Sequence, residues 1–142
     1  MDNTRIGIWQ KRQNWIDEEL EKAVVAGHAM SDYALVLFQD MSLAHCAGAW
    51  ICVIIMSVST IDAHIREDIG NETIGMAQLL DNFYEGENID WLRRLRNKYV
   101  YYDINNPVLD LDSYITEQNQ LEQDATEAIK MVIKALFQNP FI

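Results

Sequence analysis

A short basic and aromatic stretch near position 100 holds the residue types best suited to chemistry on phosphates. Four of the eleven lysine and arginine residues of the chain fall in the six-residue window from Arg93 to Lys98. An arginine guanidinium offers planar, paired donors that match phosphate oxygens. Tyr101 and Tyr102 follow this window, and a tyrosine can donate a hydrogen bond or stack on a nucleobase. These residues could therefore contact an RNA backbone and its bases.

The same stretch resembles the signature of the HEPN superfamily, which is an arginine, then four residues, then a histidine, commonly with a polar residue directly after the arginine. Arg96 and Asn97 match the opening of this signature. Lys98-Tyr99-Val100 are similar to its middle, and Tyr101 occupies the histidine position. The resemblance covers Trp91 to Asp103, and outside this stretch it is one of architecture alone.

The resemblance implies an all-α fold and a metal-independent endoribonuclease, in a toxin–antitoxin or defence setting. In that chemistry the 2′-hydroxyl of RNA attacks the adjacent phosphate, a histidine moves protons, and an arginine stabilises the charge of the phosphorane. Arg96 would then bind and polarise the phosphate, Asn97 would position Arg96 or the RNA, and Tyr101 would mark the place of proton transfer. Because RNA supplies its own nucleophile, we expect no metal and no cofactor.

Tyr101 is the departure from the signature, and it bears directly on activity. Proton transfer near neutral pH needs a group with a pKa near 7, which histidine supplies. A tyrosine in a model peptide has a pKa of about 10 and is a poor general base at neutral pH. We therefore expect an inactive or impaired nuclease, through natural or engineered loss of the histidine, rather than an unusual tyrosine-based nuclease.

The remaining polar residues of the stretch have two interpretations. Arg93, Arg94, Lys98 and Tyr102 are candidate RNA-binding residues. In an acidic chain, however, a basic helix face is often only a solvated surface, here paired with Asp90 or with other acidic neighbours. The HEPN resemblance favours a functional interpretation for the motif residues and leaves both interpretations open for the others.

The spacing of Arg96 and Tyr101 limits how one helix could present them. Five residues of a regular α-helix correspond to a rotation of about 140° around its axis. One helix would therefore direct the two side chains to different sides. Either the helix ends before position 101, or two copies meet at a two-fold axis and combine their motifs. The second arrangement is the one known for HEPN domains, so the resemblance implies a homodimer.

Composition indicates one domain, residues 1–142, with a hydrophobic core, because 49% of the residues are apolar and 23% are charged. The net charge of −11 is typical of soluble proteins that do not bind nucleic acid in general. Met41–Ile61 carries no formal charge, but its polar residues favour a buried helix over a membrane span. Cys46 and Cys52 are predicted to be buried, reduced thiols, and Met1–Arg5 does not open a signal peptide. We expect a cytoplasmic protein.

Residues outside the basic stretch are predicted to be structural. His28, His45 and His64 stand singly and are interpreted as packed or surface histidines rather than metal ligands. The four tryptophans are interpreted as core or interface residues. Tyr99 continues the apolar spacing of its helix and is assigned to the core.

Helical periodicity over nearly the whole chain predicts an all-α, HEPN-like bundle of four or five helices. A short helical or irregular connection is expected at Tyr33–Phe38, a loop at Ile104–Val108, and a side-chain cap at Asn88. The helices themselves are expected over about Thr4–Ala26, Ser42–Ile69, Glu72–Tyr84, Asn88 to near Tyr102, and from Asp112 or Ser113 to Gln138.

Two alternatives compete with a nuclease. The chain could be a non-catalytic helical module for dimerisation or protein interaction, whose acidic surface suits a basic partner. It could also be a bundle unrelated to HEPN, with the motif present by chance. Some HEPN toxins have an antitoxin that modifies a tyrosine two residues after the histidine, but position 103 is Asp103. RNA, a second copy and a protein antitoxin or other partner protein are the partners considered, and no membrane partner is expected.

Overall fold

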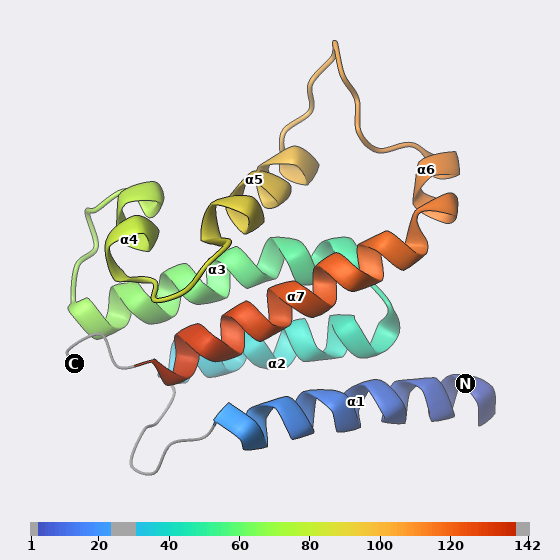
Figure 1. Cartoon of the computed structure of the whole chain (residues 1–142), viewed down its shortest axis with the longest axis horizontal. Helices are drawn as coiled ribbons and strands as arrows, with labels where there is room; N and C mark the ends of the chain where they lie inside the picture. Colours follow the sequence, from blue (N-terminus) through green and yellow to red (C-terminus); the bar gives the residue numbers. More distant parts are fainter. Residues whose placement is uncertain (1–2, 24–30, 139–142) are drawn as a thin grey trace.

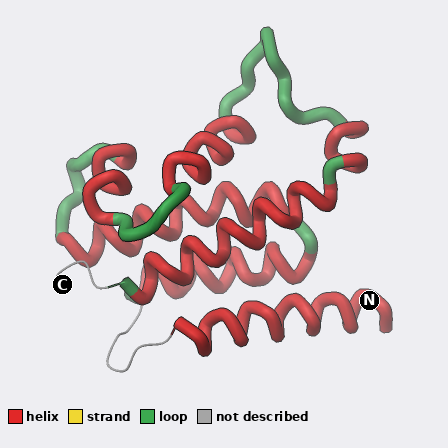
Figure 2. Tube along the Cα trace, viewed as in Figure 1, coloured by secondary structure: helices red, strands yellow, loops and turns green. Residues whose placement is uncertain are grey.

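The computed structural model describes residues 3–23 and 31–138, which form seven helices and no strand (Figures 1 and 2). The all-α prediction is thus confirmed, whereas the expected number of four or five helices is wrong. The helices are α1 (Asn3–Ala23), α2 (Asp32–Ala47), α3 (Trp50–Ile69), α4 (Met76–Phe83), α5 (Ile89–Val100), α6 (Leu111–Thr116) and α7 (Gln118–Phe137).

Helix α3 lies at the centre of the fold, where it packs against α2, α7, α5 and α4 (Figure 1). Apolar side chains on several sides of α3 make this position possible, and those fully buried are Val53, Ile54, Val58, Ile61 and Ile65. Helix α1 lies along α2 and α7 and fully buries only Ile16. No helix of the described residues is long and apolar enough to cross a membrane.

The predicted central helix from Ser42 to Ile69 is in fact two helices. Gly48 ends α2 in the left-handed conformation, with φ 77° and ψ 21°, and its N–H caps the carbonyls of the last turn of α2. Only Ala49 then separates Gly48 from α3, so α2 and α3 form an antiparallel pair (Figure 1). Apolar periodicity continues across Gly48, because both helices bury residues in the same core, and it therefore hides the break.

Helix α2 begins much earlier than predicted. The hydroxyl of Ser31 accepts a hydrogen bond from the N–H of Ala34 at 3.1 Å and caps the helix. The segment Tyr33–Phe38, expected as a connection, therefore forms the first turns of α2. Helix α1 ends at Ala23 among the described residues, and the rest of the predicted Thr4–Ala26 helix lies outside them, as does His28.

Local turns also shorten or divide other predicted helices. The side chain of Asn71 accepts from the N–H groups of Thr73 and Ile74, which delays the start of α4 to Met76. The predicted C-terminal helix is divided at Glu117 into α6 and α7. Asn88 precedes α5 with φ 69° and makes no side-chain capping bond, so the predicted cap is wrong.

The segment between α5 and α7 projects away from the bundle (Figure 1). Residues 101–115, which we call the arm, comprise the predicted loop and most of α6. Large apolar side chains of the arm are exposed, with exposed fractions of 80% for Tyr102 and 79% for Leu111. The arm therefore carries apolar surface that the core of the same chain does not cover.

Candidate functional site

Helix α5 positions the basic stretch through its own apolar stripe. Ile89 and Leu92 are buried, and Leu95 and Tyr99 pack half-buried against the core. This stripe is the predicted one, and its three- and four-residue spacing places all four side chains on the face toward α3. The polar residues between them consequently lie along the flanks and outer face of α5.

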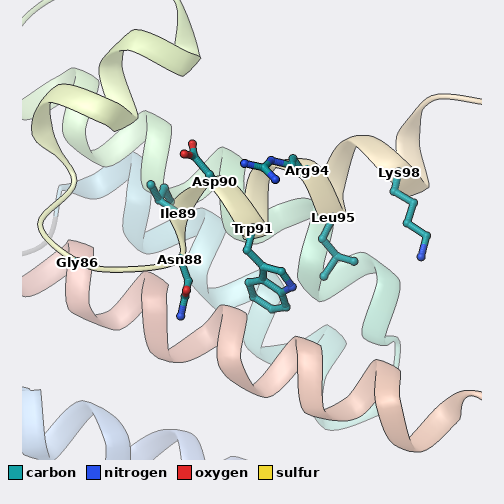
Figure 3. Close-up of a pocket in the computed structure, with 8 residues that line it drawn as sticks. All are labelled: Gly86, Asn88, Ile89, Asp90, Trp91, Arg94, Leu95 and Lys98. Carbon is teal, nitrogen blue, oxygen red and sulfur yellow. The ribbon is translucent and has the colours of Figure 1, made fainter.

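A hollow of about 580 Å³ borders one flank of α5. Its lining includes Trp91, Arg94, Leu95 and Lys98, and in Figure 3 the side chains of Trp91 and Leu95 extend from the same side of the helix. Arg94 and Lys98 are exposed, and among the described residues neither forms an ion pair. Arg94 extends on the side of Asp90 in Figure 3, and Asp90 also lines the hollow but is paired with Arg93. Two cations without ion pairs among the described residues and one indole in the same lining suit a ligand that combines an aromatic ring with negative charge.

The other flank of α5 carries polar atoms that are buried without partners. Nη2 of Arg93 donates to Oδ1 of Asp90 at 3.2 Å, and Nη2 of Arg96 donates to Sδ of Met76 at 3.4 Å. Within residues 3–23 and 31–138, however, Nη1 of Arg93, Nε of Arg96 and Oδ1 of Asn97 are buried and make no hydrogen bond. Such groups are costly in a folded protein, so three on one helix flank are unusual.

Tyr101 lies at the C-terminal cap of α5. Its N–H donates to the carbonyl of Asn97 at 3.0 Å, and its φ of −102° and ψ of 120° turn the chain away from the helix. The sequence left two arrangements open for Arg96 and Tyr101: a helix that ends before position 101, or two copies that combine their motifs. The structure has the first, because α5 ends at Val100. The Tyr101 side chain is 65% exposed, whereas Arg96 is half-buried against Met76. No hydrogen bond between described atoms joins Arg96 to Tyr101.

The structure thus brings together only part of the predicted site. Arg94 and Lys98 share the hollow, Arg93 is paired with Asp90 as the surface interpretation expects, and Tyr102 extends into solvent on the arm. Arg96 lies about 160° around the helix axis from Arg94 and therefore outside this hollow, whereas Asn97, three residues after Arg94, is only about 60° away but does not line the hollow either.

Sequence reasoning missed a second polar cluster, where α1 meets the corner between α2 and α3. Nη1 of Arg12 donates to the carbonyl of Cys46 at 3.1 Å, and its guanidinium lies 4.7 Å from the centre of the Trp50 ring. His45 is buried beside it, as the packed interpretation expects. Cys46 is buried as predicted, but Cys52 is exposed, contrary to prediction. No motif marks this cluster, since its members come from separate helices.

Comparisons with protein-family models, with curated proteins and with solved structures find no match to this chain. The likeness to HEPN domains therefore depends on the stretch from Trp91 to Asp103 together with the all-α fold.

Proposed function

We propose that this chain is a HEPN-like domain that contacts RNA through α5 and cleaves it poorly or not at all. The observation that carries this proposal is the hollow at α5, which is lined by Trp91 and by Arg94 and Lys98, two cations that form no ion pair with any described residue, in a chain of net charge −11. In an otherwise acidic protein, a polyanion is repelled from most of the surface and attracted to this helix.

In this proposal the motif residues have distinct roles. Arg96 binds a phosphate once its guanidinium leaves Met76, and its partnerless Nε supports such a change of partner. Asn97 orients Arg96 or the RNA from the same flank. Tyr101, exposed at the end of α5, is placed to donate a hydrogen bond or to stack, but it does not supply the proton transfer that a histidine performs near neutral pH. A toxin–antitoxin or defence setting is part of the same proposal.

The test is a metal-free RNA cleavage assay on the Tyr101→His variant. We expect the variant to cleave RNA about 10²- to 10⁴-fold faster than the wild-type chain, because a positioned general acid–base contributes a factor of that size. Adding Arg96→Ala should abolish the gain. Circular dichroism would establish that each variant is folded.

Matched charge removals test the part played by the hollow. In the Tyr101→His background, Arg94→Gln with Lys98→Gln should weaken RNA binding and reduce its dependence on salt, because fewer counterions are released. Lys130→Gln with Lys134→Gln removes the same charge from α7 and should have no such effect. A folded Tyr101→His chain that neither binds nor cleaves RNA would contradict the proposal.

A second candidate, a non-catalytic module that dimerises or binds a partner protein, is favoured by the arm. Soluble monomers rarely expose many large apolar side chains in one short segment, and large exposed apolar areas mark interaction surfaces. Tyr101, Tyr102, Ile104, Leu111 and Ile115 are each at least 65% exposed within the arm. Acidic residues accompany them, which suits contact with the basic α5 of a second copy.

A further inference from the structure

A separate hollow of about 390 Å³ lies where α1, α2 and α7 meet. Lys11, Arg12 and Trp15 line it from α1, His45 lines it from α2, and Glu122 lines it from α7. None of these residues belongs to the α5 site. The hollow therefore needs an explanation of its own.

His45 is the unusual member of this lining. Its side chain is only 4% exposed and lies between the rings of Trp15 and Trp50, with ring centres 5.4 Å and 5.3 Å away. Its Nδ1 is buried, and no described residue provides it with a hydrogen-bond partner. Burial and the nearby charge of Arg12 lower the pKa of His45 to about 4, so the imidazole is neutral at pH 7.

The charges of the lining favour an anion. The guanidinium of Arg12 is held in place by the Cys46 carbonyl and the Trp50 ring. Lys11 is exposed, and in the described part of the chain it makes no ion pair. The lining thus contains two cations, Lys11 and Arg12, and one carboxylate, that of Glu122. The hollow is therefore locally basic in a protein that is acidic overall.

The apolar part of the lining favours a flat molecule. Trp15 is half-buried and packs against the core, so its indole is held rigidly, and Ile8 adds an aliphatic side chain on the same helix. A volume of about 390 Å³ is at the small end of the range for ligand sites and suits a body of one or two rings.

We propose that this hollow binds a small organic monoanion with a flat apolar body, of the aromatic carboxylate class. The carboxylate lies at Lys11 and Arg12, and the ring lies against Trp15 and Ile8. His45 rearranges slightly and forms with the ligand the hydrogen bond that it lacks in the ligand-free chain. This site is independent of RNA binding at α5, and its test does not depend on that proposal.

The test is isothermal titration of the full chain with indole-3-acetate, with indole and acetate as the two partial probes. We expect indole-3-acetate to bind with a Kd below about 1 mM, which is a modest affinity for a ligand of this size. Indole, which lacks the charge, and acetate, which lacks the ring, should each bind at least about threefold more weakly. Equal binding of indole and indole-3-acetate, or no binding of indole-3-acetate, would overturn the proposal.

Variants locate the binding. Lys11→Gln should weaken the binding of indole-3-acetate about two- to fivefold, which is the usual size of one exposed ionic contact. It should leave the binding of indole unchanged. Lys22→Gln is the matched control, because Lys22 lies on the same helix but outside this hollow. It should change neither the affinity for indole-3-acetate nor the affinity for indole. His45→Phe should reduce, but not abolish, the preference for indole-3-acetate over indole, because Lys11 and Arg12 remain. If Lys11→Gln and Lys22→Gln bind indole-3-acetate equally, the anion does not bind at this site and the proposal fails.

Discussion

Single residues of this chain differ sharply in how well their polar atoms are paired. The guanidinium of Arg66 has several partners, because it donates to both carboxylate oxygens of Asp62 and to the carbonyl of Ile74 at 2.6 Å, which ties the end of α3 to the turn before α4. His45 is the opposite case, buried with Nδ1 lacking a partner among the described atoms. A buried nitrogen atom without a hydrogen-bond partner reduces stability, so each such atom calls for a physical explanation.

Replacing His45 by phenylalanine should stabilise the chain, and more so in mild acid. The folded-state pKa of about 4 lies below the ordinary value of 6.5, so between these values the unfolded chain takes up a proton that the folded chain excludes. This histidine therefore costs stability as pH falls from 6.5 towards 4. Thermal melts of the two chains at neutral pH and at about pH 5 measure the effect. A difference in Tm that does not grow in acid would contradict the assigned environment of His45.

At the scale of elements, two glycines in the left-handed conformation decide where helices end. Gly48 has φ 77° and Gly70 has φ 66°, and each caps the helix before it. They differ in surroundings. A Cβ at position 48 would lie 3.2 Å from Nη1 of Arg12, whereas a Cβ at position 70 would have nothing within 4 Å. Position 48 therefore favours glycine for two reasons, which are its left-handed backbone conformation and the close approach of the Arg12 side chain from α1.

Alanine substitutions separate these two contributions. Gly70→Ala should lower the free energy of unfolding by about 1–2 kcal/mol, the cost of the left-handed conformation. Gly48→Ala should lower it further, because Arg12 must also move. Gly7→Ala, inside α1 with open space around it, should instead raise it by about 0.5–1 kcal/mol. Urea unfolding measures all three, and a Gly48→Ala chain no less stable than Gly70→Ala would show that Arg12 yields without cost.

At the scale of the whole molecule, the bundle and the arm have different characters. The bundle places α3 among four neighbouring helices and forms its hydrophobic core within one chain, although α1 and α2 also expose some apolar side chains, such as Ile6 and Val36. The arm leaves its apolar residues exposed, and it begins directly after the basic helix α5 (Figure 1). An acidic, apolar arm beside a basic helix is self-complementary. In a two-fold dimer the arm of each copy can contact α5 of the other copy.

This arrangement predicts reversible association through the arm. Sedimentation velocity over about 1–100 µM should show a dimer for the wild-type chain and a monomer for Leu111→Ser with Ile115→Ser, because both side chains are exposed and their loss removes apolar contact area. Leu35→Ser with Leu43→Ser, an exposed leucine pair on α2, is the matched control. If only the Leu35→Ser with Leu43→Ser variant loses the dimer, the interface lies on α2 and not on the arm.

The local sequence pattern by itself determined that the fold is all-α and which face of α5 is turned toward the core. The stripe of Ile89, Leu92, Leu95 and Tyr99 could be predicted because helical periodicity is a property of neighbouring residues, and burial follows from it. The loop at Ile104–Val108 could be predicted for a similar reason, since proline excludes the helical conformation from the residue before it. The candidate RNA-contacting residues were found with α5, because they are contiguous in sequence.

Only the tertiary structure decided which residues from distant segments meet. The break at Gly48 was not predicted, because one glycine costs a helix only about 1 kcal/mol and gives no sign that α1 will approach it. The contact of Arg96 with Met76 joins residues twenty positions apart, and that of Arg12 with Cys46 joins residues thirty-four apart. His45 was recognised as a packed residue, but its missing hydrogen-bond partner and its place between two indole rings depend on how three helices pack. Periodicity reports which face of a helix is buried, and it does not report which neighbour covers that face.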